Sequence, residues 1–141
     1  MIINIGWLLL VTFSICIIIF DVKERKISNQ CCFLVALIAS ALNFLFYFEI
    51  QVFNPSMVLF IGVFLSMKGW LGGGDAKLFA AYSTAILPEN LFLTVLLILI
   101  VGGVVSLCCL IKNKWTKSAD RGVPYGVAIV IGSLFGIWMS L

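Results

Sequence analysis

The chain has 141 residues, of which 63% are hydrophobic and only 11% are charged, and its mean hydropathy is +1.22. Soluble domains carry about 25% charged residues, so this composition excludes a water-soluble globule and predicts an integral membrane protein. The net charge of +3 leaves no extended basic face that would follow a phosphate backbone, and we expect no nucleic-acid partner.

Six apolar segments follow one another along the chain and predict six transmembrane helices. They are continuously apolar, whereas the strands of a membrane β-barrel alternate. We therefore expect an all-α integral membrane protein with one polytopic domain, residues 1–141. The first segment lacks the basic start and cleavage site of a secretory signal, so we expect it to be a true span. The segments are residues 2–20, 31–48, 53–71, 76–87, 91–111 and 123–140.

The distribution of Lys and Arg predicts the orientation of these helices. All nine cations lie in or beside the first, third and fifth connections, whereas the second and fourth contain only Glu49 and Glu89. Cytoplasmic loops are enriched in Lys and Arg, so the odd connections are expected in the cytoplasm and both termini outside. The cluster at residues 23–26 is interpreted as a topology signal that contacts lipid headgroups.

Asp21 closes the first apolar segment, where a carboxylate is costly to keep. Charged residues at membrane spans are functional-site hypotheses by default. A second interpretation stays open, because Arg25 follows four residues later and would pair with Asp21 if the helix continued.

Asp75 follows three glycines, Gly72, Gly73 and Gly74, that interrupt the apolar pattern. Irregular backbone survives in a membrane only where protein or a water-filled cavity surrounds it. The 14 residues from Asp75 to Glu89 span about 21 Å as a helix, against about 30 Å of hydrocarbon. We therefore expect Asp75 to lie below the cytoplasmic surface, in a small aqueous cavity. Alternatively, Asp75 is simply the N-cap of the fourth helix.

The cysteines and histidines exclude several kinds of site. The chain has no histidine, which excludes Ser-His-Asp and Cys-His catalysis. None of its cysteines forms a Cys-x-x-Cys pair, so we expect no metal site and no cofactor. The cysteines are Cys16, Cys31, Cys32, Cys108 and Cys109.

Three elements together resemble the type IV prepilin peptidases, bacterial membrane aspartyl proteases of the GxGD class. They are Asp21 with residues 25–29, then Gly72-Gly73-Gly74-Asp75-Ala76-Lys77, and finally Pro124-Tyr125-Gly126. The chain lacks the cytoplasmic insertion with two Cys-x-x-Cys pairs that full-length members carry. It resembles the short peptidases of tight-adherence (Flp-type) pili. Two departures lie beside the motifs, at Ser28 and Val127, where the family often has proline.

The resemblance implies an aspartic endopeptidase in the bacterial inner membrane that cleaves the leader of a prepilin or pseudopilin at the cytoplasmic face, without N-methylation. Asp21 and Asp75 would be catalytic. The other residues that the resemblance assigns to the substrate or the active-site loop are Gly72, Gly73, Gly74, Lys77, Asn29, Pro124, Tyr125 and Gly126.

Some of these residues also have simpler interpretations. Lys77 is better explained as a topology charge or interfacial anchor than as a catalytic group. Pro124 is also explained as a break in the chain before the last helix. Asn29 either caps the second helix or orients Asp21. For the whole chain, the alternatives are a small channel or transporter that binds ions at paired aspartates, and a non-catalytic partner in pilus assembly.

Overall fold

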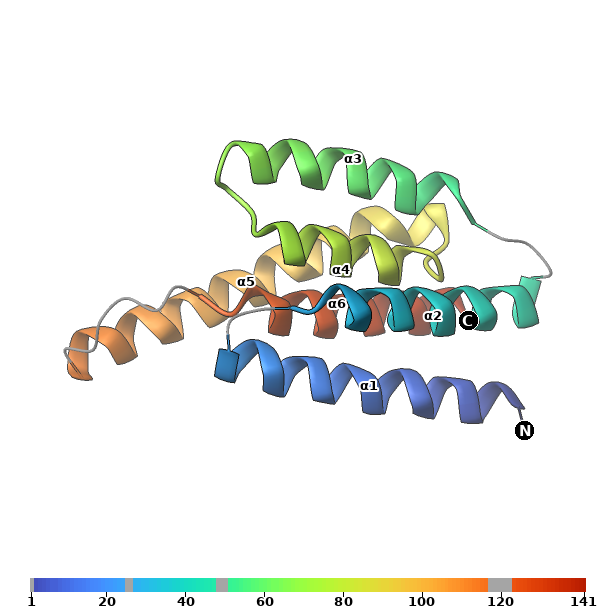
Figure 1. Ribbon diagram of the computed structural model, residues 1–141, viewed down its shortest axis with the longest axis horizontal. Helices are drawn as coiled ribbons and strands as arrows, with labels where there is room; N and C mark the ends of the chain where they lie inside the picture. The colour runs from blue at the N-terminus through green and yellow to red at the C-terminus, as the bar shows by residue number, and fades with distance from the viewer. Residues whose placement is uncertain (1, 25–26, 48–50, 117–122) are drawn as a thin grey trace.

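The computed structural model describes residues 2–24, 27–47, 51–116 and 123–141. These residues form six helices and, within the described ranges, no strand (Figure 1). The expected all-α fold is confirmed. The helices are α1 (Ile2–Glu24), α2 (Asn29–Tyr47), α3 (Phe53–Met67), α4 (Gly73–Ser83), α5 (Pro88–Thr116) and α6 (Tyr125–Ser140).

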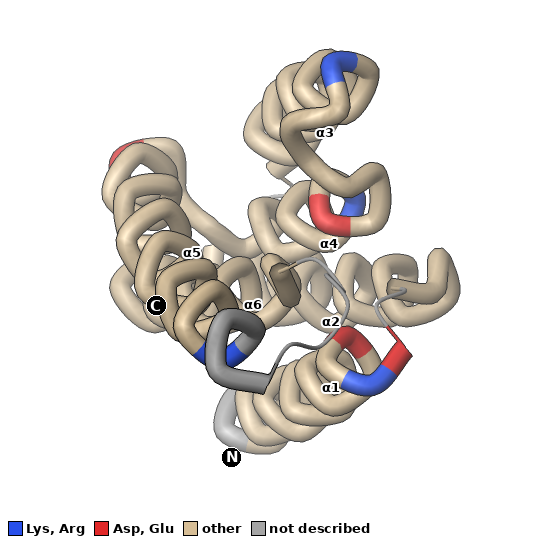
Figure 2. Tube along the Cα trace, turned by 90° about the vertical axis from the view of Figure 1, so that its left-hand side faces the viewer, with Lys and Arg blue, Asp and Glu red and all other residues tan. Residues whose placement is uncertain are grey.

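The helices run up and down, so the odd connections share one end of the bundle and both termini lie at the other (Figure 1). Viewed from the end that holds the odd connections, the described lysines and the acidic residues at the end of α1 and the start of α4 face the reader (Figure 2). The structure therefore places Asp21 and Asp75 at one end of the bundle. That this end faces the cytoplasm stays a prediction.

Three helices contain a segment long and apolar enough to cross a membrane: Ile5–Glu24, Asn29–Tyr47 and Pro88–Lys112. Helices α3 and α6 are shorter but also apolar. Helix α4 is different, because its 11 residues reach only about 16 Å, roughly half the thickness of the hydrocarbon. It is surrounded by protein instead, packing against α2, α3 and α6.

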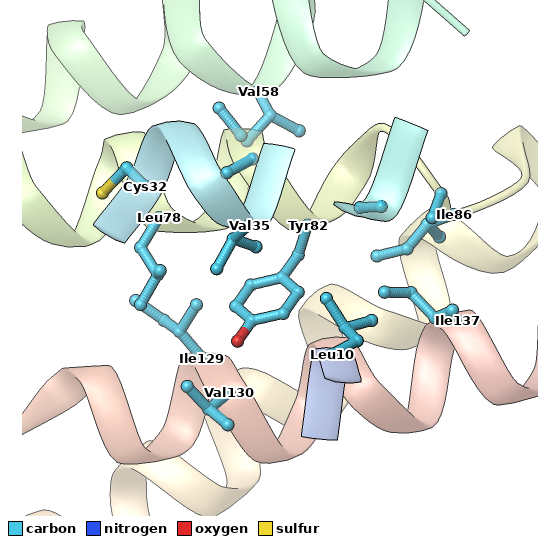
Figure 3. Close-up of a cluster of buried hydrophobic side chains, with 14 of the residues drawn as sticks. Leu10, Cys32, Val35, Val58, Leu78, Tyr82, Ile86, Ile129, Val130 and Ile137 are labelled. Atoms are coloured by element: carbon cyan, nitrogen blue, oxygen red, sulfur yellow. The ribbon is translucent and has the colours of Figure 1, made fainter. Parts of the chain in front are cut away.

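Tyr82 of α4 is the largest side chain in the buried core (Figure 3). Leu10, Val35 and Leu78 surround its ring, and its hydroxyl shares a 2.6 Å hydrogen bond with the hydroxyl of Ser14 in α1. A buried tyrosine hydroxyl needs such a partner, because an unsatisfied polar group in an apolar interior is costly. This contact ties the short central helix to the first span.

Two helices do not end where their predicted apolar segments end, because a helix can continue past the last apolar residue or stop before it. Helix α1 continues to Glu24, four residues beyond its apolar segment, so Asp21 lies inside the last turn rather than after it. Helix α3 ends at Met67, before the expected residue 71, and Gly69 then adopts a positive φ of 73°. Charged residues continue a helix into the headgroup region, whereas a left-handed glycine redirects the chain.

Helices α5 and α6 approach closely because Gly132 of α6 has no side chain. A Cβ atom there would lie 2.5 Å from Cγ1 of Ile98 and 3.1 Å from its backbone nitrogen. Small residues at helix interfaces permit such backbone contact in membranes, where apolar burial gives helices little drive to associate. The glycine thus sets the position of α6, whose first turn reaches Asp21.

We expect Gly132→Ala to destabilise the protein by about 1–3 kcal/mol, because the added methyl group overpacks the α5–α6 interface. The matched control is Gly103→Ala on α5, where a Cβ atom meets nothing within 4 Å. That change should stabilise the helix by up to about 1 kcal/mol. Thermal unfolding in detergent measures both. Equal midpoints for Gly132→Ala and the wild type would contradict the prediction.

Candidate active site

Asp21 is buried in the last turn of α1, against the first turn of α6. A Cβ atom at Gly126 would lie 2.6 Å from Oδ2 of Asp21 and 2.8 Å from its Cγ. Only glycine leaves room for the carboxyl group at this distance. The alternative partner Arg25 lies outside the described residues.

Asp75 occupies the third position of α4, whose N-cap is Gly72. The interpretation of Asp75 as the N-cap is therefore wrong. Its carboxylate instead accepts a hydrogen bond from the backbone N–H of Gly72, as the third residue of a capping box does. A Cβ atom at Gly72 would lie 2.7 Å from Oδ2 of Asp75. The helix start thus holds this carboxylate close to its own backbone.

The two carboxyl groups lie near enough for the charge of Asp21 to act on Asp75. Asp21 is buried and Asp75 is partly buried, at the same end of the bundle (Figure 2). Three helices create this proximity: α1 carries one carboxyl group, α4 carries the other, and α6 packs against Asp21. Two carboxyl groups in one poorly solvated place favour a state in which one proton is present between them.

The remaining two glycines of the motif form the first two positions of α4 and pack against other parts of the bundle. A Cβ atom at Gly74 would lie 3.4 Å from Cβ of Ile27, just before α2. One at Gly73 would lie 3.4 Å from the hydroxyl of Ser66, near the end of α3. Gly73 and Gly74 therefore let the start of α4 fit between these neighbours. Ile27 belongs to the motif at residues 25–29, whereas no sequence motif signalled the role of Ser66.

Lys77 and Asn29 connect α4 to the start of α2. The ammonium of Lys77 donates a 3.0 Å hydrogen bond to Oδ1 of Asn29. The residue that caps α2 is Ser28, whose hydroxyl accepts a 3.1 Å bond from the N–H of Gln30, so the interpretation of Asn29 as the cap is wrong. Serine before an apolar run is a recognised cap signal, and it identifies Ser28 without the structure.

The three residues of the Pro124-Tyr125-Gly126 motif have different surroundings. Pro124 is buried and precedes α6 as its N-cap. Tyr125 is 40% exposed, and its hydroxyl accepts a 3.5 Å hydrogen bond from Ser106 of α5. Gly126 packs against Asp21. Within the described residues, no group of three or more His, Cys, Asp or Glu side chains is placed to hold a metal ion.

Residues 8–107 match the model of the type IV leader peptidase family. The chain belongs to this family. The resemblance inferred from the motifs is thereby confirmed, and the protein is a membrane-embedded peptidase whose family cleaves leader peptides. The match includes Asp21, the three glycines and Asp75, and it ends before Pro124. No curated protein and no solved structure matches the chain.

We expect Gly126→Ala to slow leader cleavage about 100-fold, because the methyl group displaces the Asp21 carboxyl group from its position beside Asp75. Cleavage of a co-expressed prepilin, followed by mass spectrometry, measures the effect. Gly103→Ala, in open space on α5, is the control for adding a methyl group to a helix. Full activity of Gly126→Ala would show that α6 does not position this carboxyl group.

Proposed function

We propose that this peptidase is an aspartic endopeptidase that removes the leader peptide of a type IV prepilin or pseudopilin, with Asp21 and Asp75 as its catalytic pair. The observation that carries the proposal is the convergence of these two carboxyl groups at the meeting point of α1, α4 and α6. Each carboxyl group lies close to the backbone at a glycine, and these two contacts keep the pair in one geometry.

The pair supplies an acid and a base without any further group. The ionised carboxylate accepts a proton from water, whose oxygen forms a bond to the scissile carbonyl carbon. The protonated carboxyl group donates its proton to the carbonyl oxygen. When the tetrahedral intermediate breaks down, the carbon–nitrogen bond breaks and the departing amine takes up a proton from one carboxyl group, while a hydroxyl group of the intermediate returns its proton to the other as the carbonyl forms again. Both carboxyl groups are then ready for another water molecule.

The position of the pair supports cleavage at the cytoplasmic face of the inner membrane. Four lysines lie near the same end as the aspartates, Lys23, Lys68, Lys77 and Lys112, and Figure 2 shows Lys residues gathered at that end. By the distribution of charge this end faces the cytoplasm. Lys77 and Asn29 then lie beside the site, where they hold α2 and α4 together rather than take part in proton transfer.

The substrate class follows from what the chain lacks in sequence. Its 141 residues contain no Cys-x-x-Cys pair, and such pairs mark the family members that also methylate the new amino terminus. We therefore assign this chain to the short, Flp-type peptidases, and we expect the mature pilin that it releases to carry no N-methyl group. The mass of that pilin tests this assignment.

Replacing either aspartate, as Asp21→Asn or Asp75→Asn, should reduce leader cleavage by more than about 100-fold, because asparagine can neither accept nor donate the required proton. The measurement is the mass of a co-expressed Flp-type prepilin in membranes. Glu89→Gln is the matched control, since Glu89 is an exposed carboxylate at the opposite end of the bundle.

Size-exclusion profiles of the purified variants separate a catalytic defect from misfolding. Cleavage that persists after either substitution would exclude the aspartic mechanism. Ion flux through vesicles that contain the wild type, abolished by both substitutions, would instead identify a channel or transporter.

A further inference from the structure

An apolar groove opens beside the candidate active site, between the pair α3–α4 and the pair α5–α6. Helix α3 packs against α4, and α5 packs against α6, which leaves a cavity of about 290 Å³ between the two pairs. Figure 2 shows α3 and α5 on different sides of the bundle, with α4 and α6 between them. We call this cavity the α3–α5 groove.

Among the described residues that line the α3–α5 groove, Asp75 alone carries a polar side chain. The other walls are apolar, with Met57 and Leu65 on α3, Leu91 and Leu99 on α5, and Ile129 on α6. The lining of α3 extends over the eight residue steps from Met57 to Leu65, which is about 12 Å along the helix axis. The groove therefore extends from one catalytic carboxyl group toward the middle of the bundle.

We propose that the α3–α5 groove binds the apolar transmembrane segment of the substrate, which enters sideways from the lipid and brings the scissile bond to Asp75. This inference rests on the proposed function, in which the leader ends where the apolar segment begins. Two turns of a substrate helix match the length of the groove. Its volume accommodates side chains from one face of that helix, while the opposite face stays in lipid.

A phospholipid is the rival occupant, and the charge at the groove argues against it. A lipid chain in the groove would place its phosphate near Asp75, and like charges repel. A peptide amide at the same place is neutral and can form hydrogen bonds. A second groove of about 450 Å³ lies beside α2, with Asn29 and Lys77 among its lining. Because Asp75 is not part of that lining, a segment bound there would not be delivered to the carboxyl pair.

Leu99 and Ile100 provide a matched pair for the test. They are consecutive residues of α5 with nearly equal exposure, 65% and 63%, but only Leu99 lines the groove. A photoreactive diazirine amino acid is placed at each position in turn, in the full chain in membranes that contain an epitope-tagged Flp-type prepilin. We expect the prepilin to crosslink at position 99 and much less at position 100.

Tryptophan substitutions add a kinetic measurement. Leu99→Trp fills part of the groove and should slow prepilin cleavage by about tenfold, whereas Ile100→Trp should cleave at the wild-type rate. Equal prepilin crosslinking at both positions, or crosslinks at position 99 to lipid alone, would overturn the groove as a substrate site. If the wild type still cleaves the prepilin, the proposed function survives that result. Crosslinking at position 99 without cleavage would retain the groove and overturn the peptidase proposal for this substrate.

Discussion

Burial of the Asp21 carboxyl group against the first turn of α6 is the constraint on which the rest of the arrangement depends. A carboxyl group at a membrane span is costly unless protein surrounds it, and here the backbone at Gly126 comes close enough to exclude any side chain. That approach requires α6 to be correctly placed, which in turn depends on the close packing of Gly132 against Ile98 of α5. A polar site is thus maintained by small residues distributed along one helix.

Helix α4 brings the second carboxyl group to this place by being short and central. Lipid would not satisfy the ends of an 11-residue helix, but α2, α3 and α6 surround it, and Tyr82 anchors it to α1 through Ser14. Its start lies within the bundle, where Gly72 donates its N–H to Asp75. The same position makes Asp75 part of the lining of the α3–α5 groove.

Hydropathy and charge predicted the number of helices and their alternation, because the hydrocarbon selects apolar segments and the connections carry the charge asymmetry. They predicted helix ends less well. Asp21 lies within α1 rather than after it, since Lys23 and Glu24 continue the helix where the apolar segment stops. The alternatives in which Asn29 and Asp75 cap their helices were also wrong, because a cap depends on which backbone group each side chain reaches.

By itself, the sequence determined that the chain is a helical membrane protein, which family it resembles, and which two carboxyl groups to examine, because composition and short motifs are local properties. Only the tertiary structure decided that Gly126 and Asp21 are in contact, that Tyr125 turns toward Ser106, and that a groove ends at Asp75. These features join residues from helices far apart in the chain. Their distances depend on how closely the helices pack, which no single segment encodes.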